Sequence, residues 1–180
     1  ACVYDHRDVV KLLLDHSERI ELNARSNNGW TAFMYACLNG QKDVVQLLLD
    51  HSDGIELNAR CFSGRTAFMM ACEYGHKEVV QLLLENSNID LKARDNHGWT
   101  AFIVACSRGH KDVVQLLLEH SERIELNARA NTGYTALILA CWEGHKDIVK
   151  LLLEYSDIDI SGYNNLSQEM IDFIELYKLN

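Results

Sequence analysis

Proline is absent from this sequence of 180 residues. Average usage near 5% would give about nine prolines, so other residues must specify the helices and turns. Long hydrophobic runs are also lacking, because no run exceeds the length of Ala136 to Trp142, which is far too short to cross a bilayer. Positive charge is scarce, with 17 Lys and Arg against 26 Asp and Glu and a formal net charge of −9. Phosphate contacts require a basic surface, so we expect no nucleic-acid partner, and no membrane partner either.

What the sequence does contain is repetition. The decapeptide HSERIELNAR is present twice, at His16–Arg25 and at His120–Arg129. Two related segments lie between these copies, HSDGIELNAR from His51 and NSNIDLKAR from Asn86. The arginines that end the four segments are separated by 35, 34 and 35 residues. A fixed period of this length predicts a solenoid, in which similar units stack into one continuous core.

Each full repeat predicts two short helices. Four copies of the pattern G-x-T-A-(F/L)-x-x-A-C-x-x-G begin at Gly29, Gly64, Gly98 and Gly133. The threonine is expected to cap the first helix and the final glycine to end it. A second helix, K-D-V-V-Q-L-L-L or a close variant, follows with an acidic residue in its first turn, where the helix dipole favours it. The next segment, I-E-L-N-A-R, alternates apolar and polar residues, which predicts a strand-like stretch.

This order of residues resembles the ankyrin repeat, and the resemblance covers nearly the whole chain. It implies an all-α fold, an ankyrin-repeat solenoid of stacked helix–turn–helix pairs with short β-like finger loops. A tetratricopeptide array has a similar period, but its Trp-Leu-Gly-Tyr spacing is not found in register. We expect a single domain over residues 1–180. Its parts are an N-terminal half repeat (1–25), full repeats (26–60, 61–94, 95–129 and 130–162) and a C-terminal capping helix (163–180).

The repeats depart from the usual ankyrin pattern in three ways. The period is 34–35 residues rather than 33, so the segment leading into each finger is longer. The T-P-L-H signature is replaced by T-A-F-M or a variant such as T-A-L-I, and apolar packing of the third residue is expected to compensate: Phe33, Phe68, Phe102 and Leu137. The finger turn keeps its usual aspartate only at Asp95, with Ser26 as a fair substitute and Cys61 and Ala130 as poor ones.

The two ends differ from the repeats. Ala1 and Cys2 align with Ala36 and Cys37, so the sequence begins within a helix and is expected to be part of a longer protein. Near the other end, an amphipathic capping helix with Ser167 as its N-cap is predicted. Its apolar stripe is Met170, Ile171, Phe173, Ile174 and Tyr177, opposite Glu169, Asp172 and Glu175.

Five of the six cysteines occupy one equivalent repeat position: Cys2, Cys37, Cys72, Cys106 and Cys141. Neighbouring helices pack about 8–10 Å apart, whereas a disulfide requires Cα atoms within about 7 Å. We therefore expect buried, free thiols and a reducing, cytoplasmic location. Cys61 is out of register at a finger tip, where an exposed thiol is expected.

Seven of the eight histidines are also in register. One group follows the glycine between the paired helices (His6, His76, His110 and His145), and another closes the second helix (His16, His51 and His120). Structural hydrogen-bond donors or solvated side chains are favoured over metal ligands at such helix ends. No HExxH, CxxC, P-loop or GxSxG motif occurs, and the same polar types recur in every repeat. The sequence therefore predicts no enzyme, no cofactor and no metal site.

Positions that differ between repeats are not needed for stacking and are free to specify a partner. They concentrate in the finger turn and in the two residues before the glycine that ends the first helix. By the ankyrin resemblance, these positions line a concave groove that binds other proteins. The candidate protein-binding residues are Asn28, Trp30, Leu38, Asn39, Phe62, Ser63, Arg65, Glu73, Tyr74, His97, Trp99, Ser107, Arg108, Thr132, Tyr134, Trp142 and Glu143.

The chemistry of these candidates agrees with an interface. All three tryptophans belong to the set, and Trp, Tyr and Arg are enriched at interface hot spots. An alternative is that Trp30, Trp99 and Tyr134 only pack along neighbouring fingers, although one ring can do both.

Charge suggests which partner the groove would accept. A ladder of arginines (Arg25, Arg60, Arg94 and Arg129), with Arg65 and Arg108, outweighs three acids, Asp95, Glu73 and Glu143, and makes the groove about +3. An acidic partner segment with apolar anchors fits that charge. The alternative is that each ladder arginine pairs with the acid four residues earlier (Glu21, Glu56, Asp90 or Glu125), a kind of exposed pair that contributes little stability.

The main functional hypothesis is a non-enzymatic, monomeric module that binds another protein or peptide through its groove and finger tips. Two alternatives remain open. The chain is a regulatory or targeting arm of a larger enzyme or effector whose catalytic part lies upstream of Ala1, or it is a passive or engineered scaffold without a natural ligand.

Overall fold

The structure is a computed structural model of the chain and describes residues 6–16, 20–155, 157–159 and 168–178. Helix α1, Arg7–Leu14, comes first, and helix pairs follow it. The pairs are α2 (Ala32–Leu38) with α3 (Lys42–Asp50), α4 (Ala67–Glu73) with α5 (Lys77–Glu85), α6 (Ala101–Ser107) with α7 (Lys111–Leu118), and α8 (Ala136–Trp142) with α9 (Lys146–Leu153). Helix α10, Gln168–Lys178, comes last.

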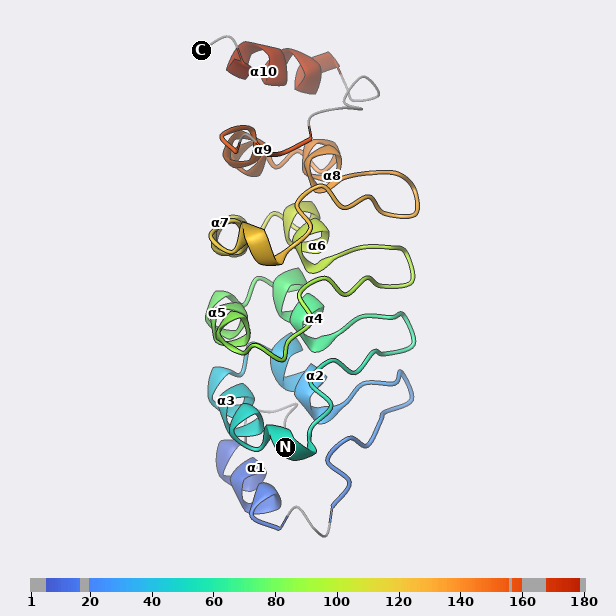
Figure 1. The fold of residues 1–180 in the computed structure, drawn as a ribbon, viewed down its shortest axis with the longest axis vertical. Coiled ribbons are helices and arrows are strands. Elements are labelled where there is room, and N and C mark those ends of the chain that lie inside the picture. Colours follow the sequence, from blue (N-terminus) through green and yellow to red (C-terminus); the bar gives the residue numbers. More distant parts are fainter. Residues whose placement is uncertain (1–5, 17–19, 156, 160–167, 179–180) are drawn as a thin grey trace.

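The helices form two rows along the long axis of the molecule (Figure 1). Helices α2, α4, α6 and α8 pack on one another in succession as an inner row, and α1, α3, α5, α7 and α9 form an outer row. Loops before each inner helix, here called fingers, project to one side of the inner row (Figure 1). Over the ranges described above, the only regular elements are helices. These features confirm the predicted all-α repeat solenoid.

Threonine and glycine bound each inner helix, as the repeated pattern predicted. Thr31 Oγ1 accepts a hydrogen bond from the backbone N–H of Met34 at 3.3 Å, and Thr66, Thr100 and Thr135 cap the other inner helices in the same way. After α2, Gly40 has φ +67°, and a Cβ there would lie 2.5 Å from Nδ1 of His76. Glycine is therefore required both for the backbone and for the space.

The core is continuous from repeat to repeat. Phe33, Phe68 and Phe102 are buried on the inner helices, and Leu137 takes the same place in α8, which confirms the predicted packing role. The in-register cysteines of the described chain, Cys37, Cys72, Cys106 and Cys141, are buried free thiols. Cys2 lies outside the described residues. Burial raises the pKa of Cys141 to about 12 and also raises the pKa values of the other three thiols.

A histidine joins each later helix pair to the pair before it. His76 Nε2 lies 2.7 Å from the carbonyl oxygen of Leu38, the last residue of α2. Equivalent bonds join His110 to Glu73 at 2.7 Å and His145 to Ser107 at 3.0 Å. A carbonyl only accepts hydrogen bonds, so Nε2 carries the proton and satisfies a helix-terminal oxygen that lacks an intrahelical donor. These histidines are structural donors, as predicted.

Asparagine provides a second link between repeats. The side chain of Asn58 donates to the carbonyl of Asn88 at 2.6 Å and accepts from the backbone N–H of Asp90 at 2.8 Å. Asn23 and Asn127 form the same two bonds to the repeat that follows each of them. Each of these asparagines belongs to an L-N-A-R segment, and Lys92 occupies the equivalent position in the remaining copy. We call this paired bonding the asparagine clamp.

The strand predicted for the I-E-L-N-A-R segments is wrong. The alternation is real, because Ile55 and Leu57 are buried while Glu56 and Asn58 are exposed. The backbone nevertheless turns, with the N–H of Ala59 donating to the carbonyl of Glu56 at 3.1 Å. The alternating burial comes from a turn whose apolar side chains join the core, without a neighbouring strand to supply a ladder.

The ends of the stack differ in how they are covered. Helix α10 lies beyond α8 and α9 and buries Met170 and Ile174, as its apolar stripe predicted (Figure 1). Ser167, its predicted cap, and the side chain of Tyr177 lie outside the described residues. At the other end, α1 leaves Val9 48% exposed, whereas Val44 at the equivalent position of α3 is buried.

Candidate functional site

Each finger is a tight turn closed by its first residue and a glycine. In the third finger, Asp95 Oδ1 accepts from the backbone N–H groups of His97 and Trp99, both at 2.9 Å. In the first finger, Ser26 Oγ accepts only the N–H of Trp30, at 3.2 Å. Asp95 as the ideal turn residue and Ser26 as a weaker substitute agree with the sequence-based expectation.

Neighbouring fingers are also bonded to one another. The side-chain amide of Asn96 donates to the carbonyl of Phe62 at 2.8 Å, and that of Asn131 donates to the carbonyl of Asn96 at 3.0 Å. Phe62 occupies the position equivalent to Asn96 and cannot make this side-chain bond. Phe62 is instead 73% exposed, so the second finger presents an aromatic side chain to solvent at a position where other repeats have asparagine.

The expectation of an exposed thiol at Cys61 is wrong. Its side chain is buried, and Sγ lies 3.1 Å from Oγ of Ser63 within the same turn. Cys61 occupies the first position of its finger turn, as Asp95 does in the third finger. The side chain at this position points into the finger rather than toward its tip.

The predicted binding residues differ widely in exposure. Most are exposed: Asn28, Asn39, Phe62, Ser63, Tyr74, His97, Arg108, Thr132, Trp142 and Glu143. Others are half-buried: Trp30, Leu38, Arg65, Trp99 and Tyr134. Glu73 and Ser107 are each 7% exposed and therefore cannot offer much surface to a partner.

The half-buried aromatics at the finger bases pack on the core, and two have close ring partners on the inner helices. The ring centroid of Trp30 lies 5.1 Å from that of Tyr35, and Tyr134 meets Trp142 edge-on at 4.2 Å. Trp99 also packs against the core. Packing along the scaffold is thus real for these rings, as the alternative interpretation held, yet Trp142 remains 48% exposed. Tyr35, which precedes the recurring Ala-Cys pair, was not among the predicted residues, because no sequence pattern marks that position.

An ion network lies between the second and third repeats. Glu73 accepts from Arg65 through Oε2 and from Arg108 through Oε1, the latter at 2.8 Å. Arg65 Nε also lies 3.5 Å from Oδ2 of Asp95. The carboxylates are deep, with side-chain exposures of 7% for Glu73 and 1% for Asp95, while the arginines are 27% and 54% exposed. We call these four residues the arginine–carboxylate network.

The comparison with known sequences now decides the family. A sequence model described as Ankyrin repeats (3 copies) matches residues 1–95, 53–130 and 87–164. The chain belongs to the ankyrin-repeat family. A search of curated proteins gives no match. Ankyrin repeats are generally protein–protein interaction modules, and the family typically has no catalytic role.

The ladder arginines of this ankyrin-repeat chain pair across repeats. Arg25 Nη2 lies 3.0 Å from Glu56, and its Nη1 donates to the carbonyl of Arg60 at 2.8 Å. Arg94 and Arg129 pair in the same way with acids of the next repeat, Glu125 at 2.5 Å and Asp159 at 2.7 Å. The alternative pairing, with the acid four residues earlier in the same segment, is therefore wrong for these three arginines. The predicted groove charge of about +3 did not count these paired acids, so it was an overestimate.

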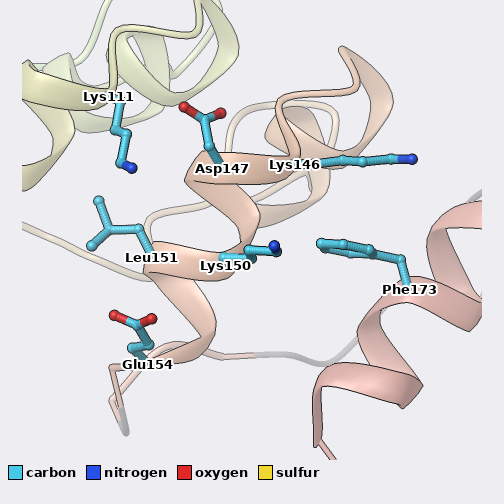
Figure 2. A pocket seen from close by; sticks show the side chains of 7 residues that line it. All are labelled: Lys111, Lys146, Asp147, Lys150, Leu151, Glu154 and Phe173. Carbon is cyan, nitrogen blue, oxygen red and sulfur yellow. The ribbon is translucent and has the colours of Figure 1, made fainter.

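On the outer row, a cavity of about 480 Å³ is lined by Lys111, Lys146, Asp147, Lys150, Leu151, Glu154 and Phe173 (Figure 2). The ammonium groups of Lys146 and Lys150 each lie 5.8 Å from the centre of the Phe173 ring. Lys146 also bonds Glu169 of α10 at 2.7 Å, which lowers the pKa of that carboxyl. The cavity therefore forms where the capping helix docks on α9, and Lys146 and Lys150 contact the cap.

The described residues contain no group of three or more metal-ligating side chains placed to hold an ion. Over the same part of the ankyrin-repeat chain, no helix has the length and apolar character needed to span a bilayer.

Proposed function

We propose that this chain is a non-enzymatic module that binds another protein or peptide through the groove formed by its fingers and inner helices. The proposal rests on the positions at which large apolar side chains remain exposed. Outside α1, the exposed large hydrophobic residues of the described chain are Phe62, Tyr74 and Trp142. All three lie on the fingers or at the ends of inner helices, at positions where the repeats differ.

Exposed aromatics at variable positions support binding because the stack does not need them. The positions of Phe62 and Tyr74 hold asparagine in another repeat, at Asn96 and Asn39, and the helices there keep the same caps. Aromatic side chains supply large contact area at a low cost in conformational entropy, and they dominate interface hot spots. We therefore assign the partner contact to this face and propose that the chain acts as a monomer.

The test is capture of partners from a lysate with the parent chain and two variants of equal fold as baits. One bait carries Phe62→Ala, Tyr74→Ala and Trp142→Ala, all at exposed positions. The matched control carries Gln46→Ala, Gln81→Ala and Gln115→Ala, exposed residues of the outer helices. Circular dichroism establishes that the parent and both variants fold equally. A protein captured by the parent and the control, but not by the aromatic variant, is the expected result; equal capture by all three baits contradicts the groove assignment.

A further inference from the structure

The arginine–carboxylate network is the feature of the groove that stacking does not explain. The position of Arg65 holds Trp30, Trp99 or Tyr134 in the other repeats, and that of Glu73 holds Leu38, Ser107 or Trp142. Uncharged residues therefore complete the same contact elsewhere in the stack. Burying the carboxylate of Glu73 carries a desolvation cost that those repeats avoid.

The network is also incompletely satisfied. Arg65 Nε and Asp95 Oδ2 are buried without a hydrogen-bond partner among the described residues, at a separation of 3.5 Å from each other. On Arg108, the bond to Glu73 uses Nη2, and no described residue accepts from its Nη1 or Nε. A guanidinium carries five N–H donors in a fixed fork that suits a carboxylate. Donors thus remain available on the more exposed arginine.

Within the network, the negative charges lie deeper than the positive charges. Two arginines and two acids sum to zero, but the acids lie beneath and the guanidinium groups lie above them, 27% and 54% exposed. A partner facing this surface meets hydrogen-bond donors and positive charge first. Glu73 fixes both guanidinium groups by bonding each through a different oxygen, so the donors are already positioned.

The chain as a whole limits how acidic the partner can be. A net charge of −9 repels a run of acids, whereas at physiological salt a single contact is governed by charges within about 8 Å. Tyr74 follows Glu73 directly and is 53% exposed, with its ring stacked on that of His76 at 6.4 Å. An exposed aromatic surface therefore lies next in the chain to the residue that positions the donors.

We infer that Arg65 and Arg108 receive a single Asp or Glu carboxylate of the partner, flanked by an apolar side chain that packs on Tyr74. This rests on the proposed function and narrows it to the second and third repeats. Glu73 acts as a positioning residue, because it holds the two guanidinium groups without being exposed itself. Arg108 is the residue on which the partner carboxylate depends most, since it has both exposure and free donors.

The probe for this inference is a library of random dodecapeptides displayed on phage and selected on the parent chain. Selected sequences are then synthesised, and their affinities are measured for the parent, for Arg108→Gln and for Lys42→Gln. The last variant is a matched control that removes one exposed positive charge from an outer helix. Each selected peptide is also synthesised with its Asp or Glu changed to the corresponding amide, Asn or Gln.

We expect the selected peptides to share one Asp or Glu next to an aromatic or aliphatic residue. Arg108→Gln and the amide peptide should each weaken binding by about tenfold or more, the effect of losing a hydrogen bond between charged groups. Combining both changes should add little to either alone. Lys42→Gln should change affinity by less than about twofold, as expected for an exposed charge in the first full repeat, outside the network.

Two other outcomes overturn the inference in different ways. Peptides that bind the parent but not the Phe62, Tyr74 and Trp142 alanine variant, and that lack an acid or tolerate Arg108→Gln, remove the carboxylate site and leave the proposed groove intact. Peptides that bind the aromatic variant as well as the parent remove both the site and the groove assignment.

Discussion

The imidazole Nε2 of His110 lies 2.7 Å from the backbone carbonyl oxygen of Glu73, which is 37 residues earlier in the chain. One repeat thus completes the helix end of the repeat before it, and the oxygen it satisfies belongs to the residue that holds Arg65 and Arg108. The stacking contact and the candidate recognition site share a residue here, one through its backbone and the other through its side chain.

Replacing His110 with alanine should weaken the contact between the second and third repeats. The carbonyl of Glu73 would lose its donor, which costs about 1–2 kcal/mol in the free energy of unfolding. Urea unfolding followed by circular dichroism measures this change. His97→Ala is the matched control, because His97 is exposed at a finger tip, and it should shift stability by less than about 0.5 kcal/mol. Equal effects of the two variants would contradict the structural role of His110.

Lys92 marks a missing asparagine clamp, so Lys92→Asn should stabilise the chain. The new side chain could bond the following repeat as Asn58 does at 2.6 and 2.8 Å, and two such bonds contribute about 1–2 kcal/mol. The reciprocal variant, Asn58→Lys, should destabilise the chain by a similar amount. Both are measured by urea unfolding against the parent. A Lys92→Asn protein no more stable than the parent would show that the third repeat cannot accommodate the clamp.

The arginine–carboxylate network should prove dispensable for stability. Glu73→Leu alone leaves Arg65 and Arg108 without their carboxylate and should cost about 1–3 kcal/mol. The double variant Arg65→Trp with Glu73→Leu copies the first repeat, where Trp30 and Leu38 stand, and should recover the parent's stability to within about 1 kcal/mol. Thermal and urea unfolding provide the measurement. If the double variant is less stable than the single one, the network is part of the scaffold.

The buried thiols should make stability fall at high pH. An unfolded thiol ionises near pH 9.0, whereas burial raises the pKa of Cys141 to about 12 in the folded chain. The unfolded state therefore releases protons first, so this contribution to stability is complete below pH 9 and is lost as the pH rises toward 12. Each such thiol lowers the free energy of unfolding by up to about 1.4 kcal/mol per pH unit in that window.

Comparison of the parent with Cys141→Ala isolates this effect from the titration of lysine and tyrosine. The stability advantage of the parent over Cys141→Ala should stay constant below pH 9 and shrink as the pH rises above 9. A difference that does not depend on pH would mean that Cys141 reaches solvent in the folded state.

The sequence by itself determined the elements of the stack and their boundaries. The threonine caps, the glycine stops and the in-register cysteines and histidines all came from local rules: capping, positive φ and periodic burial. A pattern repeated four times tests each rule four times, which is why the helices could be predicted closely. Variation between repeats likewise pointed to the face where Phe62, Tyr74 and Trp142 are exposed.

Only the tertiary structure decided which side chains meet across repeats. Arg25 pairs with Glu56 of the next repeat rather than with Glu21 of its own, and Glu73 is buried beneath Arg108 rather than displayed beside it. Cys61 turns inward, and the alternating segment around Leu57 is a turn rather than a strand. The two ion pairs join residues 31 and 35 positions apart, so they depend on how one repeat lies on the next. That relation is set by packing between whole units, and no local pattern of residues contains it.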